Sequence, residues 1–86
     1  MTRLCITRVL EKMNALDRLM EKYDDRSTEY YQKGDLERSI KWDHRVDLIE
    51  RQIEGIRYTL TTLGLGVWKT RDGQWVIPDD DIKNAI

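Results

Sequence analysis

The 86-residue chain is poor in the residues that usually stabilise or activate a small protein. It has one cysteine, one histidine and one proline, and it has no phenylalanine. A single cysteine excludes an intramolecular disulfide and favours a reducing compartment. A single histidine leaves a structural zinc site without its usual ligands. Because a chain this short is only marginally stable alone, we expect a partner, most simply a second copy, to stabilise it.

The chain also lacks an excess of charge of either sign and lacks any long apolar run. Lysine plus arginine number 15 and aspartate plus glutamate number 16, spread evenly along the chain. No segment has the basic excess that dominates affinity for nucleic acid, so nucleic acid is not favoured as a partner. No apolar run approaches a membrane span or a signal-peptide core, so we expect a soluble, cytoplasmic protein with no membrane partner.

Side chains that are mostly apolar or aromatic instead recur at alternating spacings of three and four in two long segments. This heptad pattern is typical of coiled-coil helices, and it persists for about four heptads in each segment. The first stripe is Ile6, Val9, Met13, Leu16, Met20, Tyr23, Ser27 and Tyr30, and the second is Ser39, Trp42, Val46, Ile49, Ile53, Ile56, Leu60 and Leu63.

The residues between the stripes are typical of a turn between two helices. Gly34 can adopt the left-handed conformation that ends a helix, and Asp35 can cap the next helix. When the chain is folded back between these two residues, every member of the first stripe lies opposite a member of the second. The stripes and the turn therefore agree on one register for an antiparallel hairpin.

That register also predicts how the seam packs near the turn. It places Ser27 opposite Trp42 and Ser39 opposite Tyr30. A small residue then meets a large one in each layer, as a densely packed core requires.

The periodicity changes after Gly64, which is expected to end the second helix. Residues 67–77 surround an Asp-Gly pair and predict a β-hairpin. Two registers are possible for it. A two-residue turn would pair Thr70 with Trp75, whereas a turn with a bulge at the glycine would pair Lys69 with Trp75.

A short helical turn is expected at the end of the chain, capped by the acidic run at residues 79–81. Its apolar face would consist of Ile82, Ala85 and Ile86. An isolated two-stranded ribbon is marginal in water, so the tail must pack on something. The nearest support is the open end of the helical hairpin, at Leu4, Ile6, Leu63 and Leu65.

The sequence thus predicts a mainly α protein in which a long antiparallel two-helix coiled-coil hairpin precedes a small tail. The predicted helices span about residues 3–33 and 35–63, the β-hairpin 67–77 and the C-terminal helical turn 80–86. We expect one domain over residues 1–86, with the helical hairpin in 1–63 and the β-ribbon and tail in 64–86.

Candidate interaction residues lie at the turn and in the tail. They are Tyr31, Leu36, Ile40 and Trp42 near the turn and Trp68, Trp75 and Ile77 in the tail. The turn-end group either closes the turn locally or forms a surface for a dimer or partner, because a two-helix seam leaves this side uncovered. The tail tryptophans either form a binding hot spot or anchor the ribbon as core.

The residues that could take part in catalysis or metal binding are isolated from one another in this chain. His44 falls on the outer face of the second predicted helix without a fixed acid–base partner. Cys5 is expected to act as a small hydrophobe, and the Asp79–Asp81 run lacks the alternating ligands of a calcium loop. We therefore expect no catalytic, metal or cofactor site and no small-molecule substrate.

Two local resemblances accompany this pattern. Residues 30–40, YYQKGDLERSI, resemble the turn between the helices of a tetratricopeptide repeat, although the chain has no second copy of that unit. The helix end Leu63-Gly64-Leu65 followed by a ribbon with an Arg-Asp-Gly tip is similar to the last helix and wing of winged-helix DNA-binding domains. That resemblance implies Lys69 and Arg71 as phosphate contacts, but the family's compact three-helix core is missing.

The leading expectation is a small interaction or assembly protein whose hairpin pairs with a second copy into a four-helix arrangement or docks on a larger protein. Short, motif-free chains of this kind are common among accessory products of phages and mobile elements, including inhibitors of host proteins. The alternative is a nucleic-acid-binding regulator that uses the ribbon as a wing.

Overall fold

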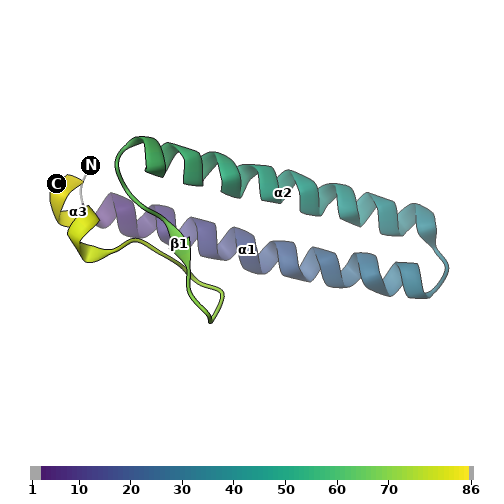
Figure 1. Ribbon diagram of the computed structural model, residues 1–86. Helices are drawn as coiled ribbons and strands as arrows, with labels where there is room; N and C mark the ends of the chain where they lie inside the picture. Colours follow the sequence, from purple (N-terminus) through teal and green to yellow (C-terminus); the bar gives the residue numbers. More distant parts are fainter. Residues whose placement is uncertain (1–2, 86) are drawn as a thin grey trace.

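The structure, a computed structural model, describes residues 3–85, without the side chains of residues 84 and 85. Its elements are α1 (Arg3–Gln32), α2 (Leu36–Thr62), β1 (Trp68–Lys69), β2 (Trp75–Val76) and α3 (Asp79–Ala85). The two long helices run side by side and antiparallel along a body of 51 × 22 × 16 Å (Figure 1). The predicted helical hairpin, β-hairpin and short C-terminal helix are confirmed.

The turn between α1 and α2 is formed by Gly34 and Asp35, as predicted. The Gly34 amide donates to the Tyr31 carbonyl at 3.0 Å and the Asp35 amide donates to the Tyr30 carbonyl at 2.9 Å. These two bonds form a Schellman ending, which requires the positive φ of 80° that Gly34 adopts. The Asp35 carboxylate accepts a hydrogen bond from the Arg38 amide at 3.2 Å and so caps α2.

The seam between the helices is the predicted heptad stripe. The buried members are Ile6, Met13, Leu16 and Ser27 on α1 and Ser39, Ile49, Ile53 and Leu60 on α2. The other members are half-buried except for Leu63, which is 51% exposed. Leu63 differs from the prediction because α2 ends at Thr62 and the chain turns away there.

The serines near the turn also differ from the predicted layers. Each was expected to face an aromatic ring, but their hydroxyls lie 3.1 Å apart. The Ser27 hydroxyl also lies 2.6 Å from the Asp43 carboxylate. A hydroxyl donates one proton, so Ser27 donates to the carboxylate and accepts from Ser39. Trp42 tilts instead onto Tyr23, with ring centroids 5.1 Å apart.

The tail closes the open end of the helical hairpin. Gly64 has φ +85°, and the Leu65 amide donates to the Leu60 carbonyl at 2.9 Å, which gives α2 a Schellman ending like that of α1. The chain then returns across α1 (Figure 1). A local core forms there from Ile6, Leu65, Val67, Ile77 and Ile82. Of the residues expected to support the tail, Ile6 and Leu65 are buried, whereas Leu4 and Leu63 are exposed.

The β-hairpin has the bulged register. Lys69 pairs with Trp75 and Trp68 pairs with Val76. Gly73 has φ +82° and its amide donates to the Thr70 carbonyl at 3.0 Å, as in a tight turn followed by a glycine bulge. The paired strands are shorter than the predicted span of residues 67–77.

Helix α3 is attached to the preceding loop by one side chain. The Asp81 carboxylate accepts a hydrogen bond from the Gly66 amide at 2.9 Å. Ile82 is buried, in agreement with its predicted place on the apolar face. The side chain of Ala85 and the whole of Ile86, the other predicted members of that face, lie outside the described residues.

Candidate interaction surfaces

The tail is fixed to α1 by a side chain that sequence patterns did not single out. The Trp75 amide donates to the Asn14 carboxamide oxygen at 2.7 Å, and the Asn14 amide group lies 3.4 Å from the Trp75 carbonyl. The carboxamide thus pairs with the outer edge of β2 much as a neighbouring strand would. Nothing local signals this role, because Asn14 is a polar residue just outside the heptad stripe.

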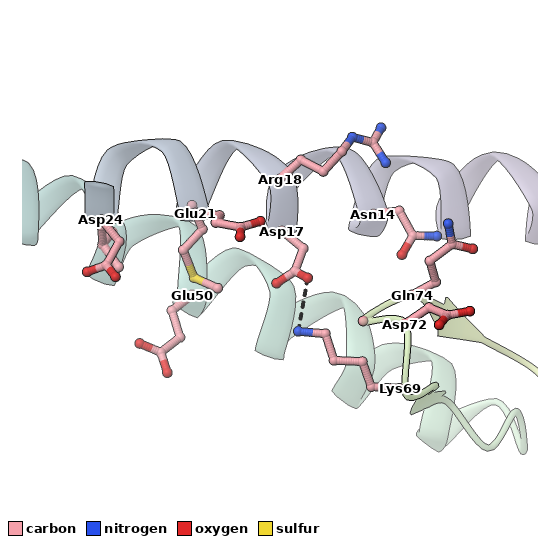
Figure 2. A pocket seen from close by; sticks show the side chains of 12 residues that line it. Asn14, Asp17, Arg18, Glu21, Asp24, Glu50, Lys69, Asp72 and Gln74 are labelled. Carbon is pink, nitrogen blue, oxygen red and sulfur yellow. Dashed lines mark ion pairs between the residues drawn. The ribbon is translucent and has the colours of Figure 1, made fainter. Parts of the chain in front are cut away.

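A second link joins the tail to α1 one turn further along the helix. The Lys69 ammonium lies 2.9 Å from the carboxylate of Asp17, a mostly buried side chain (Figure 2). This ion pair crosses the edge of a cavity of about 660 Å³ between the β-turn and the helices. Glu21, Asp24 and Glu50 also line the cavity, together with Arg18, so carboxylates outnumber cations in its walls.

The tail residues singled out in the sequence have different environments. Ile77 is buried in the local core, and Trp75 is half-buried between α1 and α2, with the Arg57 guanidinium 5.8 Å from its ring. Trp68 is 56% exposed. Trp75 therefore anchors the ribbon, and Trp68 is the tail tryptophan that a partner can reach.

The two residues of the winged-helix alternative, Lys69 and Arg71, also lie in different environments. Lys69 is neutralised by Asp17, whereas Arg71 is exposed at the tip of the β-turn. The ribbon lies against the side of α1 (Figure 1). A wing must present its cations outward to phosphates, so the Asp17–Lys69 pair weighs against that role.

The turn end carries an exposed apolar group, which we call the turn-end patch. It consists of Tyr31, Leu36 and Ile40, which are 66%, 56% and 66% exposed. Trp42, the fourth candidate residue, is half-buried, and the Arg45 guanidinium lies 4.4 Å from its ring centroid. The turn-end patch is available to a partner, and Trp42 is screened by its own neighbours.

A second apolar surface, absent from the sequence-based candidates, lies on the side of the hairpin away from the tail. It is a groove of about 600 Å³, which we call the seam groove. Its apolar lining is Val9, Leu16, Ile56, Leu60 and Leu63, and Arg8 and Lys12 stand at its edge. The small residues Gly55 and Thr59 flank it and leave it open. The heptad stripe contains these apolar residues, but it does not tell which side of the seam the tail leaves bare.

The remaining candidates for chemistry are dispersed. His44 and Cys5 are both exposed, on different helices. Within residues 3–85, no three His, Cys, Asp or Glu side chains gather as a metal site requires. No described helix has an apolar stretch long enough to cross a bilayer.

No protein-family model, curated protein or solved structure matches this chain.

Proposed function

We propose that this protein is an assembly module whose copies associate through the helical hairpin. The observation that supports this is that the turn-end patch stays exposed after the tail has docked, and that Val9, Ile56 and Leu63 stay half-buried or exposed in the seam groove. Contiguous exposed apolar surface on a small protein marks an interaction site. Covering it also supplies the apolar burial that an 86-residue chain has difficulty providing alone.

The tail supports this proposal by what it leaves uncovered. It closes one end of the hairpin through Ile77 and Ile82 and covers one side of the seam through Trp75. On the other side Val9 and Ile56 remain half-buried in the groove. A second hairpin packed there would complete a four-helix arrangement around the seam.

Sedimentation velocity over a range of protein concentrations tests the proposal. We expect the weight-average sedimentation coefficient to rise with concentration. Leu63→Gln places a polar group in the groove and should weaken association. Leu4→Gln, at an exposed leucine outside the groove, is the matched control and should leave association unchanged. A wild-type protein that remains monomeric at the highest soluble concentration would overturn the proposal.

A further inference from the structure

The two sides of the helical hairpin differ in what lies against them. We call the side with the seam groove the open face and the side on which the tail docks the tail face. On the open face the groove edge is formed by Arg8 and Lys12 of α1 and Gln52 of α2. On the tail face the charged residues of the hairpin that line the cavity are Asp17, Arg18, Glu21 and Asp24 of α1 and Glu50 of α2, so carboxylates outnumber cations there.

These assignments extend along both helices because residues seven apart lie on nearly the same side of a helix. The basic residues of the open face are then Arg8, Lys12, Lys22, Arg26, Lys33, Arg38, Lys41 and Arg45. Three of these cations are paired with carboxylates: Lys33 with Glu29 at 3.1 Å, Arg38 with Asp35 at 3.5 Å and Lys41 with Glu37 at 3.6 Å. The acidic residues of the tail face are Asp17, Glu21, Asp24, Asp43, Asp47, Glu50 and Glu54, against the basic residues Arg3, Arg18 and Arg57. The hairpin is therefore basic on one face and acidic on the other.

The burial of the seam agrees with this division. The stripe residues nearest the open face are Val9, Leu16, Tyr23, Tyr30, Trp42, Ile49, Ile56 and Leu63, and most are half-buried or exposed. The stripe residues nearest the tail face are mostly buried. Ring contacts agree as well, because Arg38 lies over Tyr30 and Arg45 over Trp42, whereas Arg57 lies over Trp75 of the tail. The open face is thus both basic and apolar.

The turn-end patch belongs to the opposite face. Tyr31 lies seven residues after Asp24, and Ile40 lies seven residues before Asp47, so all four share the tail face. The tail itself docks near Asn14 and leaves this end of the face bare. Each molecule therefore exposes one apolar surface flanked by cations and one flanked by carboxylates, on opposite faces.

We propose that the open face of one copy binds the turn end of the tail face of a second copy. The turn-end patch of the second copy enters the seam groove of the first, and Asp24 and Asp47 face Arg8 and Lys12. This inference rests on the self-association proposed above and specifies its surfaces. One contact then covers both apolar surfaces and pairs opposite charges, which favours correct encounter and disfavours wrong partners.

The alternative of pairing two open faces is disfavoured by charge. It would bring the basic rows of both copies together, and juxtaposed like charges at an interface cost several kcal/mol. The opposite-face contact is heterologous, so it repeats from copy to copy instead of closing as a two-fold dimer. Association should therefore yield species larger than a dimer as concentration rises.

Two charge-reversal variants test this pairing. Arg8→Glu/Lys12→Glu reverses the groove edge, and Asp24→Lys/Asp47→Lys reverses the patch edge. Among residues 3–85 none of these four side chains forms an ion pair, so the fold should persist, as circular dichroism can verify. We expect each variant alone to associate at least about tenfold more weakly than wild type. An equimolar mixture should restore association, because each reversed edge then meets a complementary one.

The outcomes separate the two proposals. A monomeric wild type overturns both. If the wild type associates but neither variant is weakened, or if the mixture restores nothing, self-association stands and the pairing of opposite faces is overturned. The wild type could instead stay monomeric and bind a generic DNA duplex or an acidic helical peptide, with binding abolished by Arg8→Glu/Lys12→Glu. That result would overturn the proposal that a second copy binds the open face.

Discussion

Asn14→Ala tests how the tail is held on the helical hairpin. The Asn14 carboxamide accepts from the Trp75 amide at 2.7 Å and lies within donating distance of the Trp75 carbonyl at 3.4 Å. Alanine removes both partners and leaves the Trp75 backbone groups in place. The tail residues that depend on this contact include Ile77 and Ile82, whose side chains are buried at the open end.

The cost follows from the two hydrogen bonds. A partly buried N–H left without its acceptor costs about 1–3 kcal/mol, and the 2.7 Å bond supplies most of this because the 3.4 Å contact is long. Alanine is a better helix former than asparagine by roughly half a kcal/mol, which offsets part of the loss. The net destabilisation should be about 0.5–2.5 kcal/mol, and it should be concentrated in the tail.

Amide hydrogen exchange measured by NMR resolves this local effect. We expect the Trp75 amide to exchange faster by about tenfold for each ~1.4 kcal/mol lost. Amides at the centre of α1 and α2 should change much less. Asp25→Ala, an exposed position on the same helix, is the control for helix propensity. If Trp75 protection is the same in Asn14→Ala as in the control, Asn14 does not hold the tail.

Three further predictions concern the seam, the glycines and the tail. Ile53→Asp places an unpaired charge at a buried seam position and should cost more than about 3 kcal/mol, so a near-unchanged melting temperature by circular dichroism would contradict the seam. Gly34→Ala should lower the free energy of unfolding, measured by urea denaturation, by about 1 kcal/mol because φ is +80°. Gly55→Ala should raise that free energy by up to ~0.8 kcal/mol because Gly55 lies in a helix interior with open space around it. Shifts of the same sign would refute that assignment. Lys69→Ala removes the ion pair with Asp17 and should cost about 0.5–1 kcal/mol, with a smaller effect in high salt. A loss that salt does not reduce would mean that packing of the Lys69 stem, not charge, matters.

The helical hairpin could be predicted from the sequence because its determinants are local and repetitive. The heptad stripe sets which side of each helix is buried, and Gly34 and Asp35 end one helix and cap the next through bonds between near neighbours. The structure departs from the pattern where a residue outside it ends the helix. Leu63 continues the stripe, but Gly64 ends the helix there and Leu65 is buried instead.

The position of the tail could not be predicted in the same way. It depends on single polar contacts across the fold, from Asn14 to Trp75, from Asp17 to Lys69 and from Asp81 to Gly66. Each joins residues far apart in the sequence, and none belongs to a periodic pattern. The environments of Trp68 and Trp75 follow from this docking, so spacing alone could not separate the exposed tryptophan from the anchoring one.

The charge asymmetry of the hairpin could not be predicted from the sequence for a different reason. Positive and negative residues are balanced in every long segment, so counting along the chain finds no patch. The opposite charges are instead segregated onto different sides of each helix. Basic residues predominate along the open face and carboxylates along the tail face. A net charge of −1 therefore coexists with one face on which cations predominate and one on which carboxylates predominate. The proposed contact between the open face of one copy and the tail face of the next requires such a distribution, and a chain that is nearly neutral as a whole can provide it.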